Sequence, residues 1–257
     1  MRVTFLGTGT SYGIPVPACT CPVCTSPDPR DKRLRTAVLV EAAGLSVLLD
    51  TPPDLRTQCL RHAIPRIDLV LLSHSHADHL FGLDDLRPYT NRMPAPLPVF
   101  ASPGTARDAA RIFDYLSAPP LPGTSLARIS LRPVPPDPFD FGPLRLTPLP
   151  VPHGRADMYG WRIDAGGRSA AFVTDCKTIP PSTLDRLRGL DLMVLDALRP
   201  EPHPTHLSLS ESAAFLGKIA AKRSFVVHLC HAVSHAAADS LLPPSVHPAR
   251  DGLVLDF

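Results

Sequence analysis

The chain has 257 residues, of which 44% are hydrophobic, and its formal net charge at pH 7 is +2. Such a chain can bury a large core. It has no apolar stretch near the roughly 18 residues of a membrane-spanning helix, and no block of lysine and arginine of the length that binding a long polyanion calls for. We therefore expect a protein with no membrane contact, cytoplasmic by default, whose substrate is a small anion rather than nucleic acid.

Short apolar segments predict strands along the whole chain. They cover residues 3–6, 37–41, 46–50, 68–72, 98–101, 144–149, 170–174, 192–195, 225–227 and 253–257. Helical patterns lie between them, at residues 54–62, 106–116, 182–188 and 208–222. The last begins with Ser208 three residues before Glu211, the spacing of a capping box. Strands that pair into two sheets with helices outside them predict an α/β fold of four layers, an αββα sandwich, in a single domain of residues 1–257.

Residues 88–138 hold many of the 32 prolines of the chain. Proline lacks a backbone donor and has a restricted φ, so we expect most of this insertion to run as stiff irregular connections over the surface. It could serve as a substrate lid or as an oligomer contact, and a homodimer is therefore possible.

A cluster of metal-binding residue types directly follows the predicted strand at 68–72. It consists of His74, His76, Asp78 and His79. Four such side chains within six residues cannot point the same way on a strand or a helix, so we expect a loop that surrounds bound metal. Imidazoles at His74 and His76 can face one ion while Asp78 and His79 turn toward a second, which suits a borderline metal with nitrogen and oxygen ligands. A solvated, histidine-rich turn is the alternative.

Three further candidate ligands stand at the ends of predicted strands, where a rigid sheet can direct them. They are His153, Asp175 and His228. Each one alone could equally be a structural polar residue. Together with the histidine-rich loop they predict a site for two metal ions.

This loop, followed by a distant histidine, a distant aspartate and a last histidine, resembles the pattern of the metallo-β-lactamase superfamily. The resemblance assigns His74, His76 and His153 to one metal, Asp78, His79 and His228 to the other, and Asp175 to the bridge between them. A carboxylate bridge is similar to that of the hydrolytic phosphodiesterases and glyoxalase-type thioesterases of the superfamily. In the lactam-cleaving branch a cysteine tends to occupy that place. Cys176 is one residue away and on a strand points to the opposite face.

A second metal site is indicated near the N-terminus, in a loop at residues 19–24. Cys19, Cys21 and Cys24 lie within six residues, whereas the other three cysteines are scattered. Three thiols at this spacing suit a tetrahedral structural zinc that lacks one ligand, and His231, three residues beyond His228, is the natural fourth. The loop with its histidine partner resembles the PhnP-type phosphodiesterases of the superfamily, and the resemblance extends along nearly the whole chain. Free thiols or a redox pair are the alternatives.

The expected chemistry follows from the paired ions. Two cations about 3.5 to 4 Å apart can share a water, lower its pKa toward neutrality and present hydroxide to an electrophile. Asp78 or Asp175 would orient that water. The resemblance also places Asp50 behind the metals, where its carboxylate can hold a ligand histidine by the far nitrogen. Pro52 replaces the glycine that is usual in that turn.

Departure of the leaving group from a phosphodiester needs a proton, which a histidine is suited to give. His206 matches the family position for this role, and His203 competes because it lies only three residues away. Basic residues that follow the motif elements are candidates for contacts with phosphate oxygens; they are Arg87, Arg155, Lys177 and Arg199. We expect His62, His235 and His247 to be structural or solvent-facing, although His235 could lie near the site.

These features predict a metal-dependent hydrolase with two divalent ions, zinc or manganese, at the catalytic site and one structural zinc. The expected substrates are small nucleotide or ribosyl phosphodiesters, cyclic ones among them. Hydrolysis of a thioester or lactone, and RNA processing as in the nuclease branch of the superfamily, are the alternative activities. A non-catalytic accessory subunit with a vestigial site is a further alternative, against which the intact ligand set argues.

Overall fold

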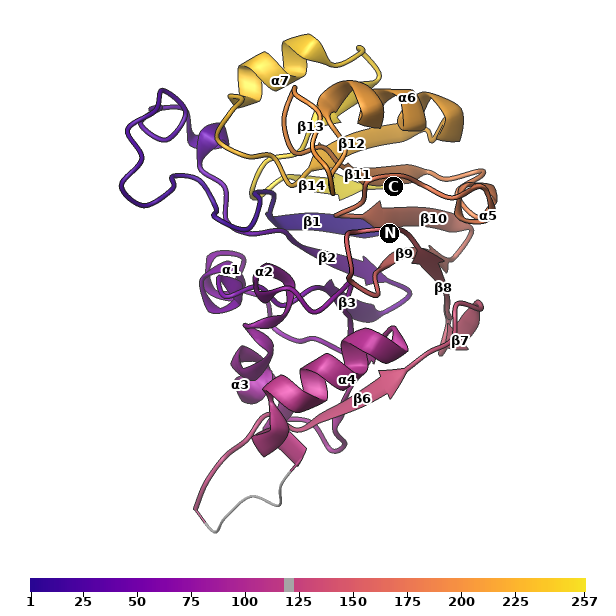
Figure 1. Ribbon diagram of the computed structural model, residues 1–257. Helices are drawn as coiled ribbons and strands as arrows, with labels where there is room; N and C mark the ends of the chain where they lie inside the picture. Colours follow the sequence, from indigo (N-terminus) through magenta and orange to yellow (C-terminus); the bar gives the residue numbers. More distant parts are fainter. Residues whose placement is uncertain (118–122) are drawn as a thin grey trace.

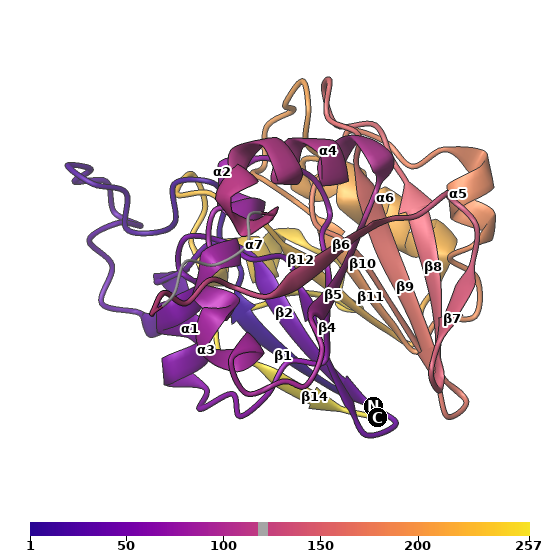
Figure 2. The same ribbon diagram turned by 90° about the horizontal axis from the view of Figure 1, so that it is seen from below.

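The computed structural model describes residues 1–117 and 123–257, and within them two seven-stranded sheets lie face to face (Figures 1 and 2). In spatial order the first sheet contains β14 (Val254–Asp256), β1 (Arg2–Gly7), β2 (Ala37–Ala42), β3 (Leu45–Leu49), β4 (Leu69–Leu71), β5 (Leu97–Ala101) and β6 (Ile129–Pro133). The second contains β13 (Val246–Pro248), β12 (Arg223–Val227), β11 (Leu192–Asp196), β10 (Arg168–Val173), β9 (Tyr159–Ala165), β8 (Leu144–Pro150) and β7 (Phe139–Phe141).

Helices cover the outer faces of both sheets. The first sheet carries α1 (Leu55–Arg61), α2 (Ala77–Leu80), α3 (Arg87–Thr90) and α4 (Pro103–Ile112), and the second carries α5 (Pro181–Asp185), α6 (Leu209–Ile219) and α7 (His235–Leu241) (Figure 1). Three short 3-10 helices, η1 (Pro29–Asp31), η2 (Leu83–Leu86) and η3 (Asp114–Ser117), complete the described helical segments. The predicted α/β sandwich with four layers is confirmed.

Three layers of buried apolar side chains hold these elements together, one between the sheets and one beneath the helices on each side. In β11, Leu192 and Val194 face the other sheet, while Met193 and Leu195 face the helices. Because side chains alternate along a strand and both faces are covered, such strands are continuous apolar runs in the sequence. This is why the predicted strands agree with the structure within one or two residues.

Four strands, β6, β7, β9 and β13, were not predicted. In β9, Gly160 and polar residues interrupt the apolar pattern. A Cβ at Gly160 would lie 2.6 Å from a methyl of Val173, so close packing against β10 requires glycine there. The predicted helices are present but shorter, and α2, α3 and α7 were missed because four to seven residues give too little periodicity. The capping box of α6 is confirmed by the bonds between Ser208 and Glu211.

Residues 88–138 are less irregular than their proline content led us to expect. Besides β5 and α4, which correspond to the predicted strand and helix, the segment supplies β6, and β5 and β6 extend the first sheet as parallel strands. The prolines occupy positions that tolerate them: Pro103 is in the first turn of α4 and Pro133 ends an edge strand. A lid or oligomer role stays a prediction, and residues 118–122 lie outside the described part.

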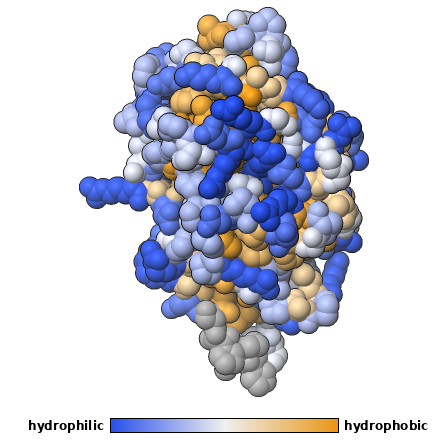
Figure 3. Space-filling view, turned by 90° about the vertical axis from the view of Figure 1, so that its right-hand side faces the viewer, coloured by the Kyte–Doolittle hydropathy of each residue, from blue (hydrophilic) through white to orange (hydrophobic). Residues whose placement is uncertain are grey.

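In the described residues, no helix combines the length and the apolar character that crossing a bilayer requires. Figure 3 views the side of the molecule that bears β7, β8 and α5. Hydrophilic side chains cover most of that face, with smaller apolar groups between them.

Candidate metal centre

The predicted donors meet at one edge of the sandwich, where strands of both sheets end. His74, His76, Asp78 and His79 follow β4, and the other three follow β8, β10 and β12: His153, Asp175 and His228. All of them are buried except His76. Parallel strands end at the same edge of a sheet, so residues far apart in the sequence come together there.

The donor atoms form groups in which all atoms lie within 4.8 Å of one another. One group is His74, His76 and His153, a second is Asp78, His79 and His228, and a third joins Asp175 to His74 and His79. This spatial grouping is the same as the division between two metals that the resemblance implies.

Asp175 lies at the centre of these groups. Its Oδ1 is 3.2 Å from Nε2 of His79, and its Oδ2 is 3.4 Å from Nε2 of His228 and 3.8 Å from Nε2 of His153. The Nε2 of His79 and the Oδ1 of Asp175 are buried without a hydrogen-bond partner. Buried polar atoms rarely stay unpaired, because an unmade bond costs about 1–3 kcal/mol. An imidazole nitrogen and a carboxylate oxygen that face each other without hydrogen-bond partners are suited to binding divalent cations.

The opposite ring nitrogens of the histidines are held by other groups. Nδ1 of His79 is 2.7 Å from a carboxylate oxygen of Asp50, and Nδ1 of His153 is 3.0 Å from the carbonyl oxygen of Thr205. Nδ1 of His74 is 2.9 Å from the hydroxyl of Ser73, and Nδ1 of His228 is 3.4 Å from the hydroxyl of Thr36. Such partners orient the rings and leave each Nε2 directed inward.

Asp50 occupies the position expected for it behind the centre. Its carboxylate accepts from the amide and the hydroxyl of Ser73, which in turn lies against His74. The following turn is tied to the histidine loop, because the amide of Thr51 donates to the carbonyl of His79. The proline at position 52 is therefore accommodated in a turn that backbone hydrogen bonds define.

The electrostatics keep most of these groups in metal-binding form. Burial lowers the pKa of His74 well below its usual value and lowers the pKa of His228 to about 4, so both imidazoles are neutral. Burial opposes the ionised form of Asp175, but the neighbouring histidines outweigh it and hold the pKa of its carboxyl well below the usual range. Burial would lower the pKa of His79 too, yet the carboxylates around it raise that pKa. Neutral imidazole and ionised carboxylate are the forms that bind metal.

His206 lies in the centre beside the donors, and His203 lies at its margin. The His206 ring is 4.7 Å from that of His153 and 5.0 Å from that of His228. The ring of His203 is tilted against that of His206, with centroids 5.2 Å apart, and its Nδ1 accepts from the amide of Thr205.

The sequence analysis missed Asp196, which ends β11. Its Oδ2 is 3.0 Å from Nδ1 of His206 and also accepts from the amides of Cys176 and Leu207. Burial lowers the pKa of His206, but the hydrogen bond and charge of Asp196 outweigh it and raise that pKa above the usual value. The signal was available, because Asp196 follows an apolar strand just as Asp50 and Asp175 do.

The candidate phosphate-binding cations differ in how far they are already paired. Lys177 bonds to Glu211 at 2.8 Å and to the carbonyl of His206, and Arg87 pairs with Asp84. Arg155 is exposed, and Nε of Arg199 is buried without a partner.

The cysteines meet as a separate cluster in the loop between β1 and β2, which projects at the left of Figure 1. Nδ1 of His231 is 3.3 Å from Sγ of Cys19 and 3.5 Å from the sulfurs of Cys21 and Cys24. The amide of Cys24 donates to the sulfur of Cys21 and lowers the pKa of that thiol to about 6, while burial raises the pKa of Cys24 to about 11. Three sulfurs and one imidazole nitrogen that converge in this way suit the tetrahedral coordination of one zinc ion.

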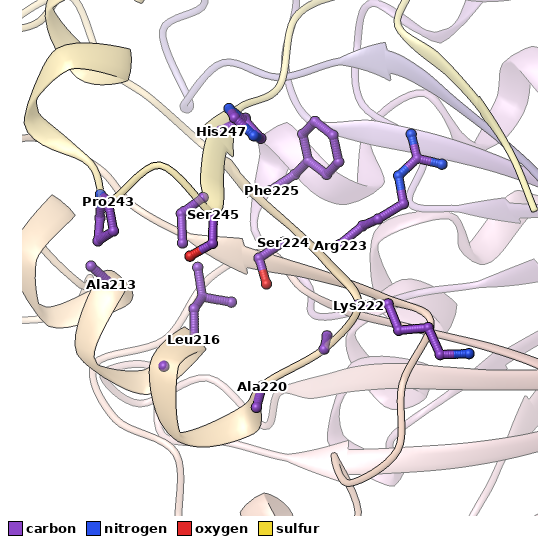
Figure 4. A pocket seen from close by; sticks show the side chains of 13 residues that line it. Ala213, Leu216, Ala220, Lys222, Arg223, Ser224, Phe225, Pro243, Ser245 and His247 are labelled. Carbon is purple, nitrogen blue, oxygen red and sulfur yellow. The ribbon is translucent and has the colours of Figure 1, made fainter.

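Cys176 points away from the centre, as expected, into the apolar layer beneath the helices of the second sheet. A cavity of about 600 Å³ lies elsewhere, between α6, β12 and β13 (Figure 4). None of its lining residues belongs to either donor cluster.

Comparison with known proteins identifies one matching family and several similar proteins. Residues 46–229 match the family model of the beta-lactamase superfamily domain. A crystal structure of a new diphosphatase from the PhnP family is 39% identical, with a TM-score of 0.91 over 100% of this chain and 97% of that chain. An octanoyltransferase of Porphyromonas gingivalis is 38% identical over 98% of this chain, which spans only 51% of that protein's length. Coenzyme PQQ synthesis protein B of Methylobacterium radiotolerans is 30% identical over 76% of this chain and 72% of its own length.

The family match covers most of the chain, and the likeness to the PhnP-family structure covers all of it. The chain therefore belongs to the metallo-β-lactamase superfamily and is similar along its whole length to a member of the PhnP family.

Proposed function

We propose that this protein is a metal-dependent hydrolase that cleaves small phosphodiesters. The observation that carries the proposal is Asp175, a buried carboxylate that faces His79, His153 and His228 with one oxygen unpartnered. Two divalent ions bound there, zinc or manganese, would supply positive charge and lower the pKa of a water. The Cys19, Cys21, Cys24 and His231 cluster would hold a structural zinc.

The residues of the centre would have different roles in binding the ions and the attacking water. His74, His76 and His153 would bind one ion and Asp78, His79 and His228 the other. Asp175 would contact both ions, and its own or the Asp78 carboxylate would orient the attacking water. The site is pre-organised, because the opposite nitrogens of the four buried histidine donors are already engaged.

His206 would donate a proton to the leaving oxygen. The hydrogen bond and charge of Asp196 raise the pKa of His206, which favours its protonated form, and the same contact holds the ring at Nδ1. This frees Nε2 to act as the donor toward a substrate, the role of a general acid. A diester with an alkoxide leaving group would gain most from such a residue.

Phosphoryl substrates are favoured by the relative that is a diphosphatase of the PhnP family. A diester carries a single negative charge, which needs fewer compensating cations than a polynucleotide does, and the chain has a net charge of only +2. We therefore place small nucleotide or ribosyl diesters first and RNA last among the substrates. A homodimer remains part of the proposal.

Acyl hydrolysis is the second candidate. The observation in its favour is the octanoyltransferase relative, whose name denotes acyl transfer and whose chain is about twice as long as the aligned region. A dinuclear centre can attack a thioester carbonyl as well as a phosphorus.

The test combines metal analysis with a substrate panel. The panel contains bis-para-nitrophenyl phosphate, 2′,3′-cyclic nucleotides, a nucleoside diphosphate ester, a structured RNA and an octanoyl thioester. We expect the small phosphate esters to be hydrolysed fastest, and Asp175→Asn to abolish that activity. Faster cleavage of the thioester would establish the second candidate instead, and faster cleavage of the RNA would establish a nuclease.

A further inference from the structure

We propose that helix α4 acts as a clamp that sets the distance between the two loops supplying the first metal position. Its contacts are made through Asp108 on the helix and through Asp157 on the His153 loop, which we assign as positioning residues. The inference rests on the proposed metal centre and adds to it a role for a helix of the 88–138 segment.

The beginning of α4 binds the loop that carries His153. The amide of Gly104 donates to a carboxylate oxygen of Asp157 at 2.8 Å. The hydroxyls of Ser102 and Thr105 both donate to the backbone carbonyl of Asp157, at 2.8 and 2.9 Å. A Cβ at Gly104 would lie 2.6 Å from the Asp157 carboxylate, so the loop sits directly on the helix. Three residues separate this anchor from His153.

The middle of the same helix binds the loop that carries the other two donors. Ser75 stands between His74 and His76, and its hydroxyl donates to a carboxylate oxygen of Asp108 at 2.7 Å. The Asp108 contact therefore restrains the backbone between two candidate ligands of the same ion.

The two loops come from different sheets, which explains why a clamp is useful. His74 and His76 follow β4 of the first sheet, and His153 follows β8 of the second. In the described residues the two sheets share no strand ladder, and near these loops one backbone bond crosses between them, from the amide of Tyr159 to the carbonyl of Ser73 at 3.0 Å. That bond precedes His74 and follows the His153 loop, so it leaves the ligand-bearing parts of both loops to other contacts. Helix α4 belongs to the outer layer of the first sheet and reaches the second through Asp157 (Figure 2). A metal site tolerates displacements of only about 0.5 Å, so this link matters.

The second group of donors is anchored differently. His79 is held by Asp50, and His228 lies against Thr36. Helix α4 faces this side with apolar groups, which belong to the same buried layer as Leu80. Phe113, which caps the end of α4, lies with its ring 6.4 Å from that of Phe81. Loosening the α4 clamp should therefore weaken binding of the ion at the first position more than binding of the other ion.

The test measures zinc bound per chain at a series of buffered free Zn²⁺ concentrations, without any substrate. The variants are Asp157→Ala and Asp108→Leu, with Asp140→Ala as a control at an exposed position paired only with exposed Arg145. We expect the first two to weaken one catalytic ion about 10- to 100-fold, as loss of a supporting contact does. Asp157→Asn and Asp108→Asn keep an acceptor and should restore most of the affinity.

A double-mutant comparison identifies which ion responds. In a His153→Ala background the first position is already impaired, so Asp157→Ala should add little, whereas in a His228→Ala background it should add its full effect. Equal effects in both backgrounds, or a parallel loss of the cysteine-site zinc, would show general destabilisation and overturn the clamp. Unchanged zinc affinity in Asp157→Ala and Asp108→Leu would overturn it while leaving the proposed hydrolase intact. A wild-type chain that binds only the cysteine-site zinc would overturn both.

Discussion

The two donor clusters are built in opposite ways. The histidine and aspartate donors stand at strand ends, are mostly buried, and have their rings held by groups such as Asp50 and Thr205. The cysteines stand in the segment between β1 and β2, all of which is described and in which regular structure is limited to η1. The sheets thus place the first set, whereas the cysteine loop has little regular structure to hold its donors, so we expect a bound zinc to contribute to its shape.

One loop joins the two clusters. His228 and His231 both follow β12, three residues apart, and the first belongs to the buried centre while the second faces the cysteines. The comparison therefore teaches that one strand end can supply a donor to each of two separate clusters. Variants in one cluster can show how far the two donor clusters are independent of each other.

The largest expected effect is that of Asp175→Asn. Loss of a negative charge between two cations raises their mutual repulsion, so the occupancy of at least one catalytic ion should fall and turnover should drop by about 10³-fold or more. Excess metal should restore little, and the cysteine-site zinc should stay bound. Metal analysis together with steady-state kinetics checks this. Near-normal turnover would mean that the bridge is placed wrongly.

The next effect should depend on the leaving group. His206→Ala should slow hydrolysis of a ribose diester about 10²- to 10⁴-fold, because an alkoxide needs a proton to depart. A para-nitrophenolate leaves without one, and its release should slow little. Asp196→Asn should show the same dependence with a smaller loss, since the histidine keeps its place. Measuring the hydrolysis rates of both substrates in parallel tests this prediction. Equal losses of rate on the two substrates would contradict the general-acid role of His206.

Cys21→Ser should affect stability more than catalysis. Removing one thiolate ligand weakens the structural zinc, and the thermal midpoint should fall by ~5 °C or more. Molecules that remain folded should keep most of their activity, because the donors of the proposed catalytic centre follow the ends of strands and do not rely on the cysteine loop. Calorimetry, zinc retention on dialysis and activity per folded molecule are the measurements. Cys59→Ser, at a buried cysteine outside both clusters, is the control. Two or fewer tightly bound ions, none held by sulfur, would contradict the cluster's role.

The smallest effect concerns the polar network at the base of the cysteine loop. His235 is buried; its Nδ1 is 3.0 Å from the Arg33 guanidinium, and its amide donates to Asp31. Burial first, and then Arg33 and Arg30, lower the pKa of His235 to about 4, against the partial opposition of Asp28 and Asp239. The folded protein therefore binds this proton more weakly than the unfolded chain does.

The contribution of His235 to folding stability must therefore decrease as the pH falls. Stability from this group is full above about pH 6.5 and declines as the pH falls toward 4, with a loss of about 2 kcal/mol at pH 5. His235→Gln removes the titrating group and keeps an acceptor for Arg33, so its stability should decline less between pH 7 and pH 5. Urea unfolding of both proteins at the two pH values tests this. Equal declines would show that His235 does not contribute.

Much of the centre could be predicted because its information is local. Four donors within six residues after an apolar strand indicate a metal loop, and apolar runs mark strands that are buried on both faces. The positions of His153, Asp175 and His228 at strand ends follow from the same pattern, as does the pairing of three close cysteines with His231.

Only the tertiary structure decided which groups support those donors. The contact of Asp196 with His206, of Thr36 with His228 and of α4 with two metal loops joins residues that are distant in the sequence. Strand β9 was hidden because the close approach of β10 requires Gly160 and thus breaks the pattern of a strand. Donor type and strand periodicity are properties of short segments, whereas the orientation of a donor depends on what the fold places beside it.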